Sequence, residues 1–347
     1  MAKGDKKPVV MESDRAVPSG IATLDASGNV PFEQLGNVAG GQLLDNADFL
    51  HLVNQRGQTE YTAAGYSIDR WKKSTAYDKV IVETGGLRLV STAATAYNTI
   101  SQPFEFPKRF HGRTVTISAV IDECVNVSGA SIILRLAKAN GEFLAEIYGG
   151  IKANGLVTAT GDVPAEYNGF AVENIQFVVR APATADGEIL VKGVGMNFGS
   201  TQKIFHQDAD GNWVLNEIPD YGEELAKCQR YFLRVKVHHP ALTYAPLIVG
   251  AYAAGAELVR GSIPLPVPMR ANPETSFGGS LRGDLLDGHA IENATVSPVT
   301  SVSTHSSYAT HVIINLNCSG AAFQTNVPAI VQANNDGAAY IDLSADL

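Results

Sequence analysis

Turn-forming pairs that end in glycine recur along the first two thirds of the chain, at intervals that leave room for short strands. Glycine adopts the positive φ that a type I′ hairpin turn needs, and asparagine and aspartate tolerate it better than most residues. The long connections that join parallel strands are missing between these pairs. The spacing therefore predicts an antiparallel all-β fold. The pairs are Asn140-Gly141, Asn154-Gly155, Asn168-Gly169 and Asp186-Gly187.

The segments between these turns have the length and composition of strands. They are rich in valine, isoleucine and leucine, which suit a pleated and partly buried surface. Short strands joined by tight turns pack as a sandwich or a jelly roll. We therefore predict a jelly-roll-like β-sandwich over residues 41–219. Its strands are expected at residues 80–82, 87–90, 115–120, 132–136, 175–179 and 189–191.

Residues 43–71 are predicted to be the entry into this sandwich. The run Asn-Gln-Arg-Gly at residues 54–57 has the composition of a tight turn. Aromatic and branched residues follow it at nearly alternating positions, which is typical of a half-buried strand. The last of them, Trp71, is the expected core anchor.

One helix is predicted near residue 220, where Asp220 and Glu223 have the spacing of a capping box. Pro219 precedes it, so a domain boundary is expected there. Residues 220–347 are predicted to form this short helix and a second β-sandwich-like domain. Alternate prolines at positions 264, 266 and 268 indicate an edge strand. Two stretches rich in Gly, Ser, Thr and Asn, residues 272–287 and 297–307, are interpreted as recognition loops.

Residues 1–40 contain too few apolar side chains to form a core of their own. Proline and glycine interrupt the segment repeatedly, and no helical or strand periodicity is present. We expect an extended attachment segment that becomes ordered beside identical segments or on a partner protein. A plain linker remains the alternative.

Charge and cysteine content exclude several classes of partner. The formal net charge is -9 and no basic run exists, so neither a nucleic-acid nor an anionic-membrane surface is expected.

No segment has the length of a signal peptide core or a membrane span. The three cysteines, Cys124, Cys228 and Cys318, are far apart and odd in number. They are expected to be buried free thiols made in a reducing cytoplasm.

No catalytic motif is present, and we expect neither an enzyme nor a cofactor. Asp284 and Asp287 are interpreted as structural carboxylates in a loop. The less expected alternative is that they form an acid/base pair for glycoside cleavage. Residues 208–213 begin like a calcium loop but are interpreted as a hairpin turn, because the later Glu ligand is missing. No metal site is predicted. The candidate residues for stacking against a sugar are the distal aromatic residues Tyr244, Tyr252, Phe277 and Tyr308.

Several phrases of the sequence resemble phage and prophage tail-fibre and appendage proteins, and the predicted jelly roll resembles carbohydrate-binding modules. The phrases contain no catalytic motif and extend over most of the length. They are GIATLDASGNVPFEQLG at residues 20–36, LLDNADF, VNQRGQTEYT and YSIDRW within residues 43–71, ELAKCQRYF at 224–232, the Pro-Met-Arg and Asn-Pro of 268–273, and YIDLSADL at 340–347.

This resemblance implies a virion structural protein that attaches the particle to the host surface through glycans. The expected state is a homotrimer, made in the bacterial cytoplasm, with residues 1–40 docked on tail, baseplate or other virion proteins. The resemblance implies that residues 220–347 face the host receptor. Two alternatives remain open, a non-adhesive collar or head-fibre component and a glycan-cleaving tail spike.

Overall fold

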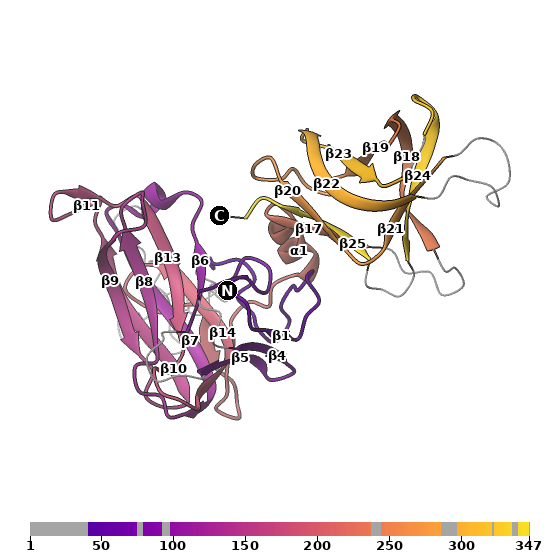
Figure 1. Ribbon diagram of the computed structural model, residues 1–347. Coiled ribbons are helices and arrows are strands. Elements are labelled where there is room, and N and C mark those ends of the chain that lie inside the picture. Colours follow the sequence, from indigo (N-terminus) through magenta and orange to yellow (C-terminus); the bar gives the residue numbers. More distant parts are fainter. Residues whose placement is uncertain are drawn as a thin grey trace, which may run out of the picture.

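A computed structural model describes residues 41–74, 79–91, 98–236, 244–285, 297–320, 323–334 and 339–346. The predicted attachment segment, residues 1–40, lies outside these residues. The chain forms a β-sandwich followed by a β-barrel, with a single α-helix in the described part between them (Figure 1). The predicted all-β class is confirmed.

The sandwich consists of two six-stranded sheets that pack face to face. The first sheet contains, in spatial order, β1 (Glu60–Tyr61), β4 (Lys79–Glu83), β5 (Gly86–Ser91), β14 (Gly187–Phe198), β7 (Arg113–Val125) and β10 (Gly155–Val163). The second sheet contains β2 (Gly65–Tyr66), β3 (Lys72–Lys73), β6 (Thr99–Pro103), β13 (Asn174–Arg180), β8 (Ser131–Ala137) and β9 (Phe143–Gly150). All strand pairs in these sheets are antiparallel, as predicted.

Smaller elements complete this half. They are the 3-10 helix η3 (Pro107–Phe110) and the hairpins β11 (Glu166–Tyr167) with β12 (Phe170–Ala171) and β15 (Phe205–Gln207) with β16 (Trp213–Leu215). The last hairpin confirms the turn predicted at residues 208–213, where the Asp208 carboxylate accepts hydrogen bonds from the backbone N–H groups of Asp210 and Asn212.

Each of the six predicted strands lies within a strand of the structure, but the glycine turns have two different roles. Asn140-Gly141 joins the hairpin β8-β9, and Asn168-Gly169 joins β11-β12. The other two pairs, at residues 154–155 and 186–187, connect strands of opposite sheets. The prediction of hairpins at these two pairs was wrong. A glycine with positive φ, such as Gly155 at 113°, can reverse the chain between the two sheets as well as within one sheet.

Trp71 is the predicted core anchor of the sandwich, and the structure confirms it. Its side chain is fully buried, and the rings of Phe49 and Phe177 contact it edge-on at centroid distances of 5.3 and 6.0 Å. The indole Nε1 donates a hydrogen bond of 2.8 Å to the backbone oxygen of Asn46. The predicted turn at residues 54–57 is also present, closed by a 3.1 Å hydrogen bond from Gly57 N to the Asn54 oxygen. Residues 43–71 therefore seal one end of the core.

The helix α1 (Tyr221–Gln229) begins as predicted, because the Asp220 carboxylate caps it by accepting a 3.0 Å hydrogen bond from Glu223 N. Two sheets follow. A three-stranded sheet contains, in spatial order, β17 (Phe232–Lys236), β25 (Tyr340–Ser344) and β20 (Glu274–Gly278). A closed barrel contains β18 (Tyr244–Gly255), β19 (Leu258–Pro264), β23 (His311–Cys318), β22 (Ser297–Ser307), β21 (Leu281–Leu285) and β24 (Pro328–Asn334).

The distal half differs from the sequence expectation in three ways. Its strands close into a barrel, whereas a second sandwich-like domain was predicted. The predicted edge strand is found only in part, since β19 is paired on both sides at residues 258–260, pairs with β23 alone at residues 261–264, and ends at Pro264, before the other two prolines. The stretches interpreted as loops contain the strands β20, β21 and β22. In β22 the buried Val299 lies between the exposed Pro298 and Thr300, and pairing with β21 and β23 holds this strand in the barrel.

The thiols follow the prediction in part. All three cysteines are free, and Cys228 and Cys318 are buried. Cys124 is only half-buried, because it lies near the end of β7 where the strand leaves the core.

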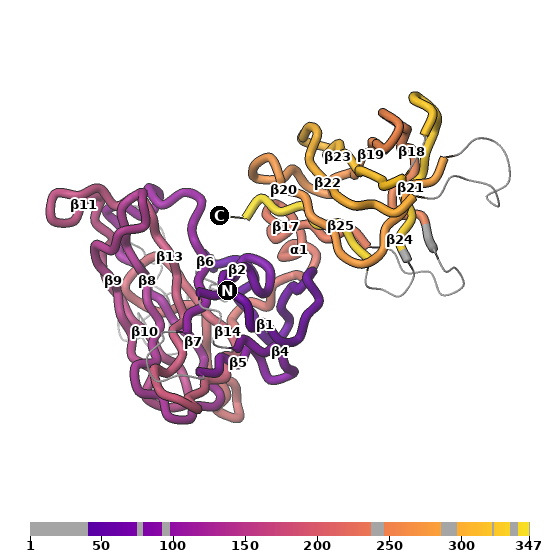
Figure 2. Tube along the Cα trace, in the orientation of Figure 1, coloured from indigo at the N-terminus to yellow at the C-terminus, as the bar shows by residue number. Residues whose placement is uncertain are grey.

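A buried ionic cluster joins the sandwich to the distal half; we call it the junction. Arg56 lies at its centre. The Arg56 guanidinium donates a 2.8 Å hydrogen bond to Asp346, lies 3.6 Å from the Asp69 carboxylate and covers the Phe232 ring at 3.7 Å. Arg234 donates to the Arg56 backbone oxygen. Figure 2 shows the chain's C-terminal end returning to the helix and to the beginning of the sandwich.

A second set of contacts surrounds this cluster. Arg70 pairs with Asp45 at 3.0 Å and covers the Tyr231 ring at 3.5 Å. The Tyr231 hydroxyl donates to Glu105 at 2.9 Å. From the sandwich side, Asn46 N donates to Glu224 of α1 at 2.6 Å. The two halves are thus held by several charged contacts that are largely withdrawn from water.

Replacing Trp71 by alanine should remove the central packing contact of the sandwich. Truncating a fully buried tryptophan costs about 3–5 kcal/mol, because the contacts are lost and a cavity remains. The Asn46 oxygen would also lose its indole donor. Equilibrium urea unfolding should show this loss in the free energy of unfolding. A change below about 1 kcal/mol would contradict the role of Trp71, and Trp213→Ala, at a half-buried position outside the main core, is the control.

The junction predicts a pH dependence centred on Asp69. Burial raises the pKa of the Asp69 carboxyl from 3.8 to about 6, although Arg56 and Gln55 oppose this shift. Between these pH values the native state holds a proton that the unfolded state has released. The free energy of unfolding contributed by Asp69 therefore falls as the pH rises through this window, by about 3 kcal/mol.

The measurement compares the wild type with Asp69→Asn by urea unfolding between about pH 4 and about pH 7. The stability of the wild type relative to the variant should decrease with rising pH. A difference that stays constant or increases would show that the junction does not raise the pKa of Asp69.

Candidate functional site

The outer face of the second sandwich sheet carries a groove of about 910 Å³. Strand alternation explains its lining. On β13, Ile175, Phe177 and Val179 are fully buried in the core, and the residues between them face outward. The outward set on this strand consists of Asn174, Gln176, Val178 and Arg180, all of which line the groove.

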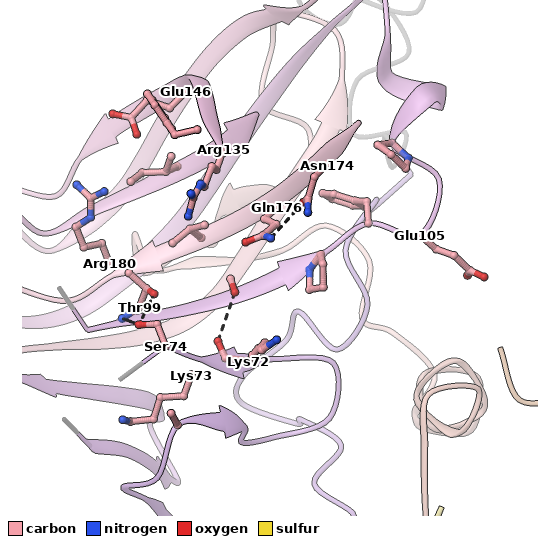
Figure 3. Close-up of a pocket in the computed structure, with 18 of the residues that line it drawn as sticks. Lys72, Lys73, Ser74, Thr99, Glu105, Arg135, Glu146, Asn174, Gln176 and Arg180 are labelled. Carbon is pink, nitrogen blue, oxygen red and sulfur yellow. Dashed lines mark hydrogen bonds between the residues drawn. The ribbon is translucent and has the colours of Figure 1, made fainter. Parts of the chain in front are cut away.

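Strand register places the groove residues in rows across the sheet. Gln176 of β13 lies between Pro103 of β6 and Arg135 of β8, and Arg135 lies beside Glu146 of the edge strand β9. The neighbouring row has an apolar centre, because Val178 pairs with Ile133. Figure 3 shows Gln176 and Arg135 projecting from neighbouring strands into the groove. The groove thus has a mixed floor of planar polar groups and small apolar steps.

The polar groups of the groove are only partly engaged with one another. Gln176 donates to Asn174 at 3.2 Å, and Thr99 donates to Ser74 at 2.7 Å. Arg135 donates through Nη2 to the backbone oxygen of Gly141 at 3.1 Å. Amide, hydroxyl and guanidinium groups in such positions can bind a ligand that carries many hydroxyl groups.

A second depression, of about 580 Å³, lies along the free edge of β9. Phe143 and Glu146 line both this depression and the groove, so the two are continuous at β9. Tyr148 and Tyr167 add two more aromatic rings. We call Phe143, Tyr148 and Tyr167 the aromatic edge. The side chain of each is exposed, by 51%, 50% and 39% respectively.

Glycines shape the aromatic edge. At Gly150 an added Cβ atom would meet the Tyr148 hydroxyl at 3.4 Å, so the Tyr148 ring lies along its own strand. At Gly161 an added Cβ atom would meet Ile147 at 2.9 Å, which lets β10 approach β9 closely. The Asn168-Gly169 turn sets Tyr167 opposite Phe170. Sequence analysis placed this turn correctly but did not select the aromatic residues beside it.

The structure places the four predicted sugar-stacking residues in three places in the distal half, with Tyr244 and Tyr252 both on β18. Tyr252 lies on β18, where its hydroxyl accepts a 3.3 Å hydrogen bond from Arg260. Tyr308 follows β22 and stacks on His311 at 4.6 Å. Phe277 of β20 packs partly against the distal core. The Tyr244 backbone pairs with Asn334 in the barrel. No ring contact between Tyr252, Phe277 and Tyr308 occurs in the described part, so a shared site there remains a prediction.

Only Asp284 of the carboxylate pair considered for cleavage lies in the described part of the chain. Asp284 is buried beside Arg282 at 3.4 Å, and burial raises the pKa of its carboxyl. Asp287 lies outside the described residues. Among the described residues, no three His, Cys, Asp or Glu side chains gather as a metal ion would require. None of their helices is long and apolar enough to cross a membrane.

Neither a protein-family model nor a curated protein matches the chain. Among solved structures, a tandem of two carbohydrate-binding modules (CBM22) from Paenibacillus barcinonensis Xyn10C is similar at 12% identity. It matches 88% of this chain and 98% of its own, with a TM-score of 0.28. The enzymatically active domain of tailspike protein 4 of bacteriophage CBA120 also has 12% identity, over 46% of this chain and 21% of its own, with a TM-score of 0.26.

An arabinose-bound α-L-arabinofuranosidase has a TM-score of 0.32 at 12% identity, over 56% of this chain and 30% of its own. All three TM-scores are low. Strand pairing defines the fold, and the groove defines the candidate site.

Proposed function

We propose that this protein is a glycan-binding attachment protein and that the groove with its aromatic edge is the binding surface. The observation that carries the proposal is the continuity of a polar groove with three exposed aromatic rings. Sugar rings offer hydroxyl groups at their rims and C–H groups on their faces. The rims match amide and guanidinium groups such as those of Gln176 and Arg135, and the faces match aromatic rings.

The size and form of the surface support an extended ligand. The groove and the edge depression have volumes of about 910 and about 580 Å³, and they share Phe143 and Glu146. A single sugar would leave most of this space to water, whereas a chain of several sugars can contact both parts. Exposed aromatic rings near one another are a feature of interaction surfaces.

We further propose that the protein acts in a bacteriophage virion, as a homotrimeric tail fibre or receptor-binding protein that binds without cleaving its ligand. This setting rests on the sequence phrases given above, and the absence of a catalytic motif from the sequence supports binding over cleavage. Three copies of a weak site would give firm attachment, since linked binding events raise the overall affinity.

Binding of the purified full chain to an array of bacterial and plant polysaccharides tests the groove. Phe143→Ala and Tyr148→Ala should each weaken binding about tenfold or more, because an aromatic contact with the sugar face is lost. The barrel supplies matched controls, Tyr252→Ala and Tyr308→Ala. Their side chains are 39% and 52% exposed, close to the 51% and 50% of Phe143 and Tyr148.

The two pairs of variants separate the two locations. If the barrel variants lose binding and the groove variants retain it, the ligand binds in the distal half and the groove assignment is wrong. If no polysaccharide binds to the folded oligomer, the protein is a structural collar or fibre component. Release of new reducing ends from a bound polysaccharide would instead identify a glycan-cleaving spike.

Deleting residues 1–40 should separate attachment to the particle from ligand binding. The groove residues all lie beyond this segment, so the truncated chain should bind polysaccharide with unchanged affinity. Particles assembled with the truncated chain should lack it, as shown by immunoblotting of purified particles. Normal incorporation of the truncated chain would show that residues 1–40 are not the docking segment.

A further inference from the structure

The charges of the groove are arranged unevenly. Arg135 and Arg180 project from the two central strands of the floor, where each is half-buried. The groove carboxylates lie toward the rim. Glu146 is exposed on the edge strand β9, and Glu173 is exposed just before β13 begins. Glu105 accepts a hydrogen bond from Tyr231 in the junction. The floor is therefore cationic although the chain as a whole has a net charge of -9.

Arg135 has little compensation for its charge within the protein. Its one hydrogen bond in the described part goes from Nη2 to the neutral backbone oxygen of Gly141, and its Nε is buried without an acceptor. Glu146 is its cross-strand neighbour, yet among the described residues these two side chains form no ion pair with each other. A guanidinium group that is partly withdrawn from water and lacks an anionic partner is costly to maintain.

A ligand with a carboxylate group would supply the missing partner. The planar guanidinium donates two parallel hydrogen bonds to a carboxylate, and such charge-assisted bonds are stronger than neutral ones. Val178 and Ile133 pair in the row between the two arginines, so the arginines stand on either side of an apolar part of the floor. Figure 3 shows Arg135 and Arg180 reaching into the same groove.

We propose that the groove selects an acidic glycan whose charged groups are carboxylates, such as a uronic-acid polymer, and that Arg135 binds one of these carboxylates. This proposal rests on the glycan-binding function proposed above and names the ligand class. The overall negative charge of the chain repels polyanions at a distance. The selection therefore depends on close contact in the groove rather than on general attraction.

The test uses three uronate polymers, polygalacturonate, alginate and hyaluronan, and the same polymers after chemical reduction of their carboxyl groups to alcohols. The full chain should bind at least one uronate polymer about tenfold or more tightly than its reduced form. Dextran and dextran sulfate serve as the neutral and the sulfated polymer. Equal affinity for a uronate polymer and its reduced form, or affinity for dextran sulfate equal to that for the uronates, overturns the proposal.

Variants of Arg135 test the assigned residue. Arg135→Gln should reduce affinity for the bound uronate polymer about tenfold or more. It should reduce affinity for the carboxyl-reduced polymer by a clearly smaller factor, because only neutral hydrogen bonds to hydroxyl groups are lost there. Arg135→Lys should restore the affinity only in part, because lysine lacks the planar fork. The control is Arg260→Gln, which alters another half-buried arginine, on the barrel strand β19, that binds the neutral Asn315 side chain.

The outcomes distinguish this inference from the function on which it rests. Neutral polysaccharide binding that depends on Phe143 and Tyr148 but not on Arg135 would retain glycan binding and reject the acidic ligand. Failure of every polymer to bind would reject both the glycan-binding function and the acidic ligand.

Circular dichroism and the melting temperature establish that each variant is folded. The comparison of native with reduced polymer tests the proposal on the wild type alone.

Discussion

The Arg56 guanidinium lies between the Asp69 and Asp346 carboxylates and on the face of the Phe232 ring, and the two halves of the structure depend on this contact. Burying an arginine is costly unless its charge is balanced and its donors are engaged. Here one carboxylate, Asp69, belongs to the sandwich, and the other, Asp346, follows β25 of the distal sheet. The charge at the junction is therefore compensated only when both halves have assembled, which couples the sandwich to the distal sheet.

Four of the segments that resemble phage appendage proteins contribute residues near this junction. Residues 43–71 supply Arg56, Asp69 and Arg70, and residues 224–232 supply Glu224 and Phe232. Residues 268–273 and 340–347 meet there as well, because Arg270 donates a 3.0 Å hydrogen bond to the backbone oxygen of Ala345. These four segments therefore encode how the two halves are joined. The floor of the groove is built from β6, β13, β8 and β9, which lie outside them, and only Ala64 and Gly65 of residues 43–71 line the groove.

The groove depends on the sandwich for its form and on the sequence between the core residues for its chemistry. One set of alternate residues fills the core, which fixes the strand register, and the other set is free to carry Gln176, Arg135 and Val178. The same register brings the edge strand β9 beside Arg135, so that Phe143 and Glu146 belong to both depressions. Because the floor of the groove is cationic although the chain as a whole is acidic, the proposed ligand is an acidic glycan rather than a neutral one.

The sequence by itself determined the all-β class, the six main apolar strands, the Trp71 anchor and the α1 cap, because each is indicated by residue type, local periodicity or capping spacing. Only the tertiary structure decided that two glycine turns cross between sheets, that the distal strands close into a barrel and that Ser297–Ser307 is a strand. The groove also belongs to this second group. Its residues lie on strands far apart in the chain, and strand pairing, a non-local interaction, brings them together.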